Sequence, residues 1–159
     1  MRTTTSSDPS SAVIPVTVRV EEPEDRAAVD DLVEEAFGDA SVKRLVQLIR
    51  ASEHWVPQLS LVATRDGELV GHVLLSTADL VANGDTQQIL LLSPLAVRPS
   101  AQGSGIARRL VEAGEERLRG LGAPRVSALA WREDAPAYGV WQATGYDENA
   151  GVARFARNL

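Results

Sequence analysis

Two closely spaced glycines, Gly103 and Gly105, stand where an apolar run changes into a helical pattern. The stretch reads LAVRPSAQGSGIARRLVEAG and begins at Leu95. The start of a helix leaves backbone amides unpaired and carries partial positive charge, so anions bind there readily. Glycines leave room for an anion to approach these amides closely. The stretch therefore predicts an anion site, and a phosphate is the expected occupant.

Two familiar phosphate-binding motifs fit this stretch poorly. A dinucleotide-binding fingerprint needs a glycine or alanine three residues after the second glycine, where this chain has Arg108. A P-loop needs lysine and then serine or threonine after its last glycine, and the only lysine of the chain is Lys43.

The stretch resembles the acyl-CoA-binding signature of the GNAT superfamily of N-acetyltransferases, Gln/Arg-x-x-Gly-x-Gly/Ala. Residues 102–107, QGSGIA, match every fixed position, and residues 95–99, LAVRP, match the strand that precedes the signature. A second hallmark, an alanine followed by a helix ending Gly-Phe/Tyr, is echoed by Ala137 and by WQATGY at 141–146. The resemblance covers nearly the whole chain, from about Val16 to Phe155.

The resemblance implies an α+β fold with a mixed, mostly antiparallel central sheet, helices on both faces, and a splayed, bulged cofactor strand. Pro94 fits that bulge because proline donates no hydrogen bond in a sheet, although it could also simply break the strand. The implied acyl donor is acetyl-CoA, without a metal. The residues implied to bind it are Leu95, Ala96, Val97, Gln102, Gly103, Ser104, Gly105, Ile106, Ala107 and Arg108, together with Asp134 and Trp141.

Acyl transfer to an amine requires a proton to leave the amine and another to reach the departing thiolate. Many relatives use a carboxylate two residues before Leu95 and a tyrosine four residues before the closing glycine. This chain has Ser93 and Trp141 there. Indole gives up no proton near neutral pH, so Trp141 is read as part of the core or the pocket wall. The backbone amide of Leu95 is the expected donor to the oxyanion.

Tyr138 and His72 are the substitute candidates for acid and base. Tyr138 lies one helical turn before Trp141 and could protonate the thiolate, or it could be a packing residue with a solvated hydroxyl. His72, on the strand expected beside the cofactor strand, has a suitable ordinary pKa of about 6.5, but a strand histidine is often structural. Weaker alternatives for the base, acting through water, are Asp79, Asp85, Glu133 and Asp134, or there is no dedicated base at all. His54 could line the acceptor site or be a surface histidine. Asp134 could instead cap the last helix.

The sequence determines the identity of the amine acceptor less well than that of the acyl donor. In the superfamily it binds to the first two helices and the loop after them, here about residues 37–59. This region contains Glu53, His54 and Trp55, which suit an amine or an amphipathic small molecule. The oligomeric state stays open, and a homodimer is one option because many relatives dimerise.

The elements that must position these residues follow from periodicity. Residues 16–22 alternate as a half-buried strand does, and residues 23–37 have helical spacing that ends at Gly38. Ser41 is the expected cap of a second helix. Turns at Asp66-Gly67 and Asn83-Gly84 predict three antiparallel strands before the cofactor loop. A long helix, a strand over 125–131, a short helix over 135–145 and a last strand near 151–159 should follow.

Composition limits the remaining possibilities. The chain has 159 residues, which suits one domain, expected over residues 14–159 after a disordered start at 1–13. It has no cysteine, which excludes thiolate chemistry, and a net charge of −6 without basic clusters, which disfavours nucleic acid as a partner. No stretch predicts a membrane span or a signal peptide, so a cytoplasmic protein is expected.

Two functions from different classes are consistent with these residues. The first is an acyl-CoA-dependent N-acyltransferase, transferring acetyl to a primary amine by direct attack in a ternary complex. The second is a catalytically inactive acyl-CoA-binding or ligand-sensing module of the same fold. The intact glycine signature favours the enzyme, whereas Ser93 and Trp141 favour the module.

Overall fold

A five-stranded sheet forms the centre of the molecule. The structure is a computed structural model that describes residues 14–130 and 134–148. The strand order β1-β2-β3-β4-β5 follows the chain: β1 (Thr17–Val20), β2 (Ser60–Arg65), β3 (Glu68–Ala82), β4 (Asp85–Val97) and β5 (Ser127–Ala128). Strands β1 to β4 are antiparallel, and β5 pairs with β4 in parallel. The mixed, mostly antiparallel sheet of the prediction is confirmed.

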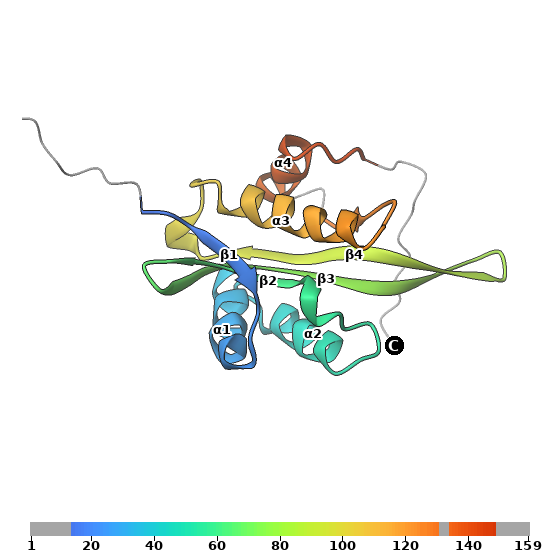
Figure 1. Cartoon of the computed structure of the whole chain (residues 1–159), viewed down its shortest axis with the longest axis horizontal. Coiled ribbons are helices and arrows are strands. Elements are labelled where there is room, and N and C mark those ends of the chain that lie inside the picture. Colours follow the sequence, from blue (N-terminus) through green and yellow to red (C-terminus); the bar gives the residue numbers. More distant parts are fainter. Residues whose placement is uncertain (1–13, 131–133, 149–159) are drawn as a thin grey trace, which may run out of the picture.

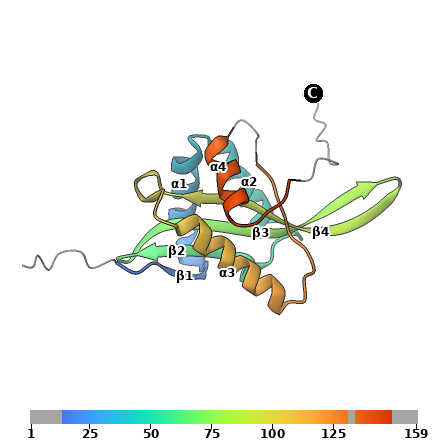
Figure 2. The ribbon, with the colours of Figure 1, turned by 90° about the horizontal axis from the view of Figure 1, so that it is seen from above.

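Helices cover both faces of this sheet (Figure 1). Helices α1 (Arg26–Phe37) and α2 (Ala40–Arg50) lie on one face, and α3 (Ile106–Gly120) and α4 (Ala135–Ala143) lie on the other. Three short 3-10 turns, at Pro23–Asp25, Pro57–Leu59 and Pro99–Ala101, lead into α1, β2 and the glycine loop. Figure 2 shows α3 running over one face of the sheet, with the loop that precedes it at one end of the helix.

The first two helices meet at a short, locally encoded junction. Gly38 ends α1 with a φ of 63°, a left-handed conformation that glycine adopts without strain. Asp39, and not the predicted Ser41, caps α2: its carboxylate accepts a hydrogen bond from the Ser41 amide at 2.8 Å. The helix begins two residues earlier than expected, and Ser41 is inside its first turn.

Both predicted hairpins are present. Asp66 and Gly67 have φ values of 52° and 77°, and Asn83 and Gly84 have 54° and 85°. Positive φ at both central residues is typical of the two-residue turn that matches the twist of antiparallel strands. Strands β3 and β4 are long, and their paired ends at the second hairpin, which include Asp79 and Asp85, extend beyond the helices (Figure 1). We call this part of the hairpin the arm.

Two apolar layers pack against the sheet. On one face α3 contributes Ile106, Leu110 and Val111 to a cluster with residues of β2, β3 and β4. On the other face α1 and α2 pack on Val62, Leu74 and Ala96. Gly71 permits the close approach of α3, because a Cβ there would lie 2.8 Å from the Ile106 side chain. The start of α3, which carries the glycine loop, is thereby held against β3.

Some predicted segments are shorter than expected or lie elsewhere. The strand expected over 125–131 is reduced to Ser127–Ala128. The expected last strand near 151–159, the expected disordered start at 1–13 and Glu133 lie outside the described residues. Among residues 14–130 and 134–148, no helix combines the length and hydropathy that crossing a membrane requires.

Candidate functional site

The cofactor strand is bulged and splayed at one place. Val73 of β3 pairs with Leu95 of β4, but Leu75 pairs with Leu92, so one residue of β3 lies opposite both Ser93 and Pro94. The pairing of β4 with β5 ends at Leu92 and Ala128. Beyond the bulge, β4 therefore has no strand on its β5 side among the described residues. Pro94 lies in the predicted bulge.

Hydrogen bonding fixes which amides of β4 face that open side. The Arg98 amide donates to the Val70 carbonyl of β3 at 2.9 Å. Alternate residues of an antiparallel strand direct their amides to opposite sides. The amides of Leu95 and Val97 therefore point away from β3, as a pantetheine arm lying alongside β4 would require. The Gln102 side-chain amide donates to the Val97 carbonyl at 3.2 Å, which confirms this orientation.

The glycine loop continues this row of donors. Gly103 and Gly105 have φ values of 74° and 79°, and a Cβ on either would find no atom within 4 Å. Gly105 is the N-cap of α3 and supplies no side-chain cap. Within the described residues, the backbone amides of residues 103–108 donate no hydrogen bond. We call these six adjacent amides at the N-terminus of α3 the amide cradle; unpaired amides at such a position are donors of the kind that bind anions.

The predicted site residues on α4, and Arg108 on α3, mainly make contacts within the protein. Asp134 caps α4 by accepting from the Ala137 amide at 3.2 Å, so the capping alternative is present. Trp141 is half-buried and packs against Tyr146, with ring centroids 5.1 Å apart. The Tyr138 hydroxyl donates to Glu148 at 2.5 Å. Arg108, exposed on α3, donates its Nε proton to Glu112 at 3.0 Å.

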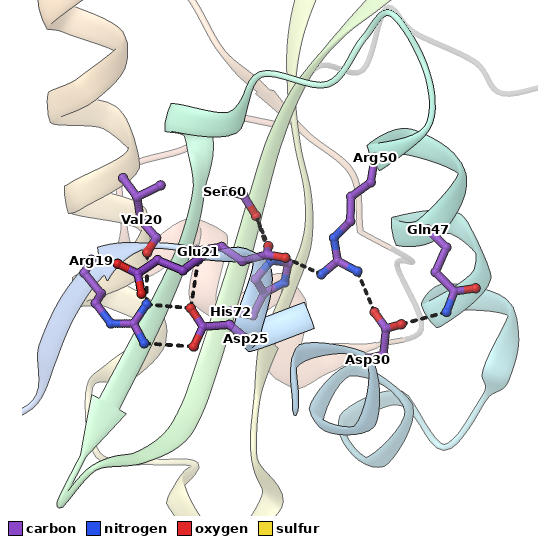
Figure 3. A network of polar contacts seen from close by, with 10 residues as sticks. Arg19, Val20, Glu21, Asp25, Asp30, Gln47, Arg50, Ser60 and His72 are labelled. Carbon is purple, nitrogen blue, oxygen red and sulfur yellow. Dashed lines mark hydrogen bonds and ion pairs between the residues drawn. The ribbon is translucent and has the colours of Figure 1, made fainter. Parts of the chain in front are cut away.

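His72 belongs to a buried polar network on the face of α1 and α2 (Figure 3). Its ring has no exposed surface, and Nε2 lies 3.2 Å from Glu21 Oε2 and 3.1 Å from Ser60 Oγ. The Ser60 hydroxyl also donates to that carboxylate oxygen. Arg50 links Glu21 to Asp30, with nitrogen–oxygen distances of 2.6 Å to each. No described residue bonds to His72 Nδ1.

The network keeps the carboxylate charged and the imidazole neutral. Burial, aided by the charge of Arg50, lowers the pKa of His72 below its ordinary 6.5, although Glu21 acts in the opposite direction. Burial by itself would raise the pKa of Glu21, but the hydrogen bonds from His72 and Ser60 outweigh it, so that pKa is lowered. Full burial argues against the predicted role of His72 as a base that contacts the amine directly.

The remaining candidates are scattered. His54 Nδ1 lies 3.1 Å from Thr77 Oγ1, which fixes the loop after α2 to β3. Asp79 and Asp85 are exposed on the arm.

Sequence reasoning missed the partners of His72, because Glu21, Arg50 and Asp30 come from separate elements. Glu21 shares the polar phase of its alternating strand with Thr17 and Arg19, so no feature of the sequence indicated that its carboxylate is buried.

Comparison with known proteins agrees with this geometry. Residues 26–146 match the acetyltransferase (GNAT) family. The uncharacterized N-acetyltransferase YjhQ of Escherichia coli is 32% identical over 123 residues, which span 77% of this chain and 68% of YjhQ. A GNAT family acetyltransferase from Brucella melitensis, solved in complex with acetyl-CoA, has 30% identity and a TM-score of 0.66, with 79% of this chain and 82% of that chain covered.

A third relative is YhbS of Escherichia coli, a GNAT family N-acetyltransferase solved with CoA. It superposes with a TM-score of 0.69 at 28% identity, over 90% of this chain and 73% of that chain. Fold, bulged strand and glycine loop thus define a protein of the acetyltransferase class. The chain belongs to the acetyltransferase (GNAT) family.

Proposed function

We propose that this protein is an N-acetyltransferase that uses acetyl-CoA to acetylate a primary amine by direct attack in a ternary complex. The observation that carries the proposal is a row of donors unpaired within the described residues: the amides of Leu95 and Val97 on the open side of β4, followed by the amides of residues 103–108. This row has the polarity and extent to bind a pantetheine arm and a pyrophosphate. Bound acetyl-CoA would supply an acetyl group activated as a thioester.

The residues at the bulge would position that group. The Leu95 amide, held on the open side of β4, donates to the carbonyl oxygen, where negative charge develops during attack by the amine. Gln102, bonded to the Val97 carbonyl, fixes the path of the chain between strand and loop. Orientation of two reactants by such fixed groups supplies a large part of the rate of a bimolecular reaction.

Two protons must move, and we assign one of them to a residue. Tyr138, half-buried on α4, exchanges its hydrogen bond to Glu148 for one to the departing thiolate and gives the thiolate its hydroxyl proton. His72 is a structural residue in this proposal because its ring is fully buried, and water takes the proton of the amine. Tyr138→Phe should lower kcat about 10²-fold or more while leaving the affinity for acetyl-CoA unchanged. An unchanged kcat would remove Tyr138 from the mechanism.

The first experiment titrates acetyl-CoA into the protein by calorimetry and then measures thiol release with a panel of primary amines. Gly105→Glu should abolish binding, because the carboxylate fills the anion site and repels phosphate. Gly122→Glu is the matched control: Gly122 also has a positive φ, 75°, and open space around it, but lies beyond the other end of α3. Equal loss in both variants, or no binding by the wild type, would contradict the assignment.

The alternative function is an acyl-CoA-binding or ligand-sensing module without catalysis. Ser93 at the bulge and Trp141 packed on Tyr146 favour it, because they occupy positions where many relatives have a carboxylate and a tyrosine. Micromolar binding without thiol release over a broad amine panel would support this alternative. Thiol release with any amine would establish the enzyme and its acceptor class.

A further inference from the structure

Arg65 reaches the glycine loop from a distant part of the chain. It is the last residue of β2, beside the Asp66-Gly67 turn, and its Nη2 donates to the Ser104 hydroxyl at 3.0 Å. Ser104 is 39 residues further along. In Figure 1 the β2–β3 hairpin and the glycine loop lie together at the same end of the sheet. A guanidinium is thus placed at the edge of the amide cradle.

The contact belongs to a rigid junction between hairpin and loop. The Arg98 guanidinium donates from Nε and Nη2 to the Leu69 carbonyl, at 3.3 Å each, and the Ser104 hydroxyl donates to the Ala101 carbonyl at 2.5 Å. The hairpin is therefore bonded at two places to the segment 98–104, which leads into the glycine loop: Arg65 bonds to Ser104, and Arg98 bonds to Leu69. Arg65 is held beside the cradle by the fold and does not depend on a ligand to reach it.

Arg65 differs from the other arginines around the loop in its partners. Arg98 pairs with Glu35, Arg108 pairs with Glu112, and Arg109 donates to the Val16 carbonyl. Arg65 makes no ion pair within the described residues; Glu68, its cross-strand partner, is not bonded to it. A guanidinium has five N–H donors, and among the described residues Arg65 engages only one of them, with Ser104. Its charge and its remaining donors are available to an anion.

We propose that Arg65 is a ligand of the pyrophosphate of acetyl-CoA, completing the backbone cradle with a side-chain cation. This inference rests on the proposed function, and it assigns Arg65 a binding role in that same site. Guanidinium groups match phosphate oxygens in geometry and form charge-assisted hydrogen bonds with them. In a chain of net charge −6, such a cation offsets the general repulsion of an anionic cosubstrate.

The test is the dissociation constant of acetyl-CoA for Arg65→Ala, measured by calorimetry at about 50 mM salt, where screening is weak. We expect it to rise about tenfold, equivalent to about 1.4 kcal/mol. Arg65→Lys should restore part of the affinity. Arg119→Ala, at the other end of α3, removes the same charge and serves as the matched control; its affinity should equal that of the wild type.

Ligand analogues identify the group that Arg65 binds. Dephospho-CoA lacks the 3′-phosphate but keeps the pyrophosphate, so the tenfold effect should persist with it. S-acetylpantetheine lacks both, so its KM should be the same for Arg65→Ala and the wild type. An effect that vanishes with dephospho-CoA would overturn the pyrophosphate assignment in favour of the 3′-phosphate.

Two further results would overturn the inference and leave the proposed function intact. One is an Arg65→Ala variant that binds acetyl-CoA as tightly as the wild type. The other is an equal loss in Ser104→Ala, which keeps the guanidinium; Arg65 would then only position Ser104. Failure of the wild type to bind acetyl-CoA would instead contradict the proposed function itself.

Discussion

Replacement of His72 by glutamine should remove most of the acid sensitivity of the fold between pH 7.5 and 5.0. The His72 ring is fully buried, and burial lowers its pKa below 6.5. The unfolded chain takes up a proton on this ring as the pH falls below about 6.5, and the folded chain takes it up only at lower pH. The unfolded state then binds more protons, so the stability of the wild type must decrease as the pH decreases.

The magnitude follows from the linkage relation. One pKa unit corresponds to about 1.36 kcal/mol, and pH 5.0 lies about 1.5 units below the ordinary pKa of histidine, so a ring kept neutral in the folded state costs at most about 2 kcal/mol at pH 5.0. The pKa of Glu21 is also lowered, which makes its stabilisation fall away in acid, but only below its ordinary value of 4.5. Between pH 7.5 and 5.0, the change in the free energy of unfolding therefore reports on His72 and not on the carboxylates.

Urea unfolding at both pH values measures this difference. Trp55 is a suitable fluorescent reporter because it packs against the apolar cluster of α1 and α2. The glutamine amide can occupy the position of Nε2 near Glu21 and Ser60 without titrating. We expect the wild type to lose up to about 2 kcal/mol between the two pH values and His72→Gln to lose far less.

His54→Gln is the control, since it removes the other histidine of the chain and should keep the acid sensitivity. Equal losses in the wild type and in His72→Gln would refute the reasoning. They would mean that the folded protein accepts a proton on His72 as readily as the unfolded chain does.

The remaining predictions concern packing and buried charge, each measured by chemical denaturation. Gly71→Ala should destabilise the fold by about 1–3 kcal/mol, because the added Cβ would lie 2.8 Å from Ile106 and 2.9 Å from Leu110. Leu110→Ala, at a fully buried site, should cost about 2–5 kcal/mol through the cavity it leaves. Arg50→Met should cost about 3–5 kcal/mol, because it leaves Glu21, with 2% of its side chain exposed, without its cation. Combining Arg50→Met with Glu21→Gln should recover part of that loss, since the uncompensated charge is then gone.

Local spacing was sufficient for several parts of the site. The glycine pair before an amphipathic helix predicts an anion cradle, and Gly103 and Gly105 adopt the left-handed φ values that such a turn needs. The Asp66-Gly67 hairpin was also predictable, whereas the bulge at Pro94 was implied by the family resemblance. These features depend on residues within a few positions of one another, where steric and hydrogen-bonding rules leave few alternatives.

Local rules were less reliable where neighbouring residues compete for one role. Ser41 was the expected cap of α2, but Asp39 takes that position and accepts the hydrogen bond from the Ser41 amide. Both residue types are good caps, so the sequence contains no feature that decides between them. The connection between the two helices, which begins at Gly38, determined which residue lies at the helix start.

Tertiary structure alone decided what His72 and Arg65 contact. Position 72 was predictable as part of a strand, but its burial depends on α1 and α2 covering that face, and its charged surroundings on Glu21 and Arg50 meeting there. Arg65 lies beside Ser104 because a hairpin and a loop meet at one end of the sheet. The sequence by itself thus determined the fold class and the anion cradle through short-range backbone geometry. Long-range packing decided the protonation of the buried histidine and the placement of the cation, because both depend on residues brought together only when the chain folds.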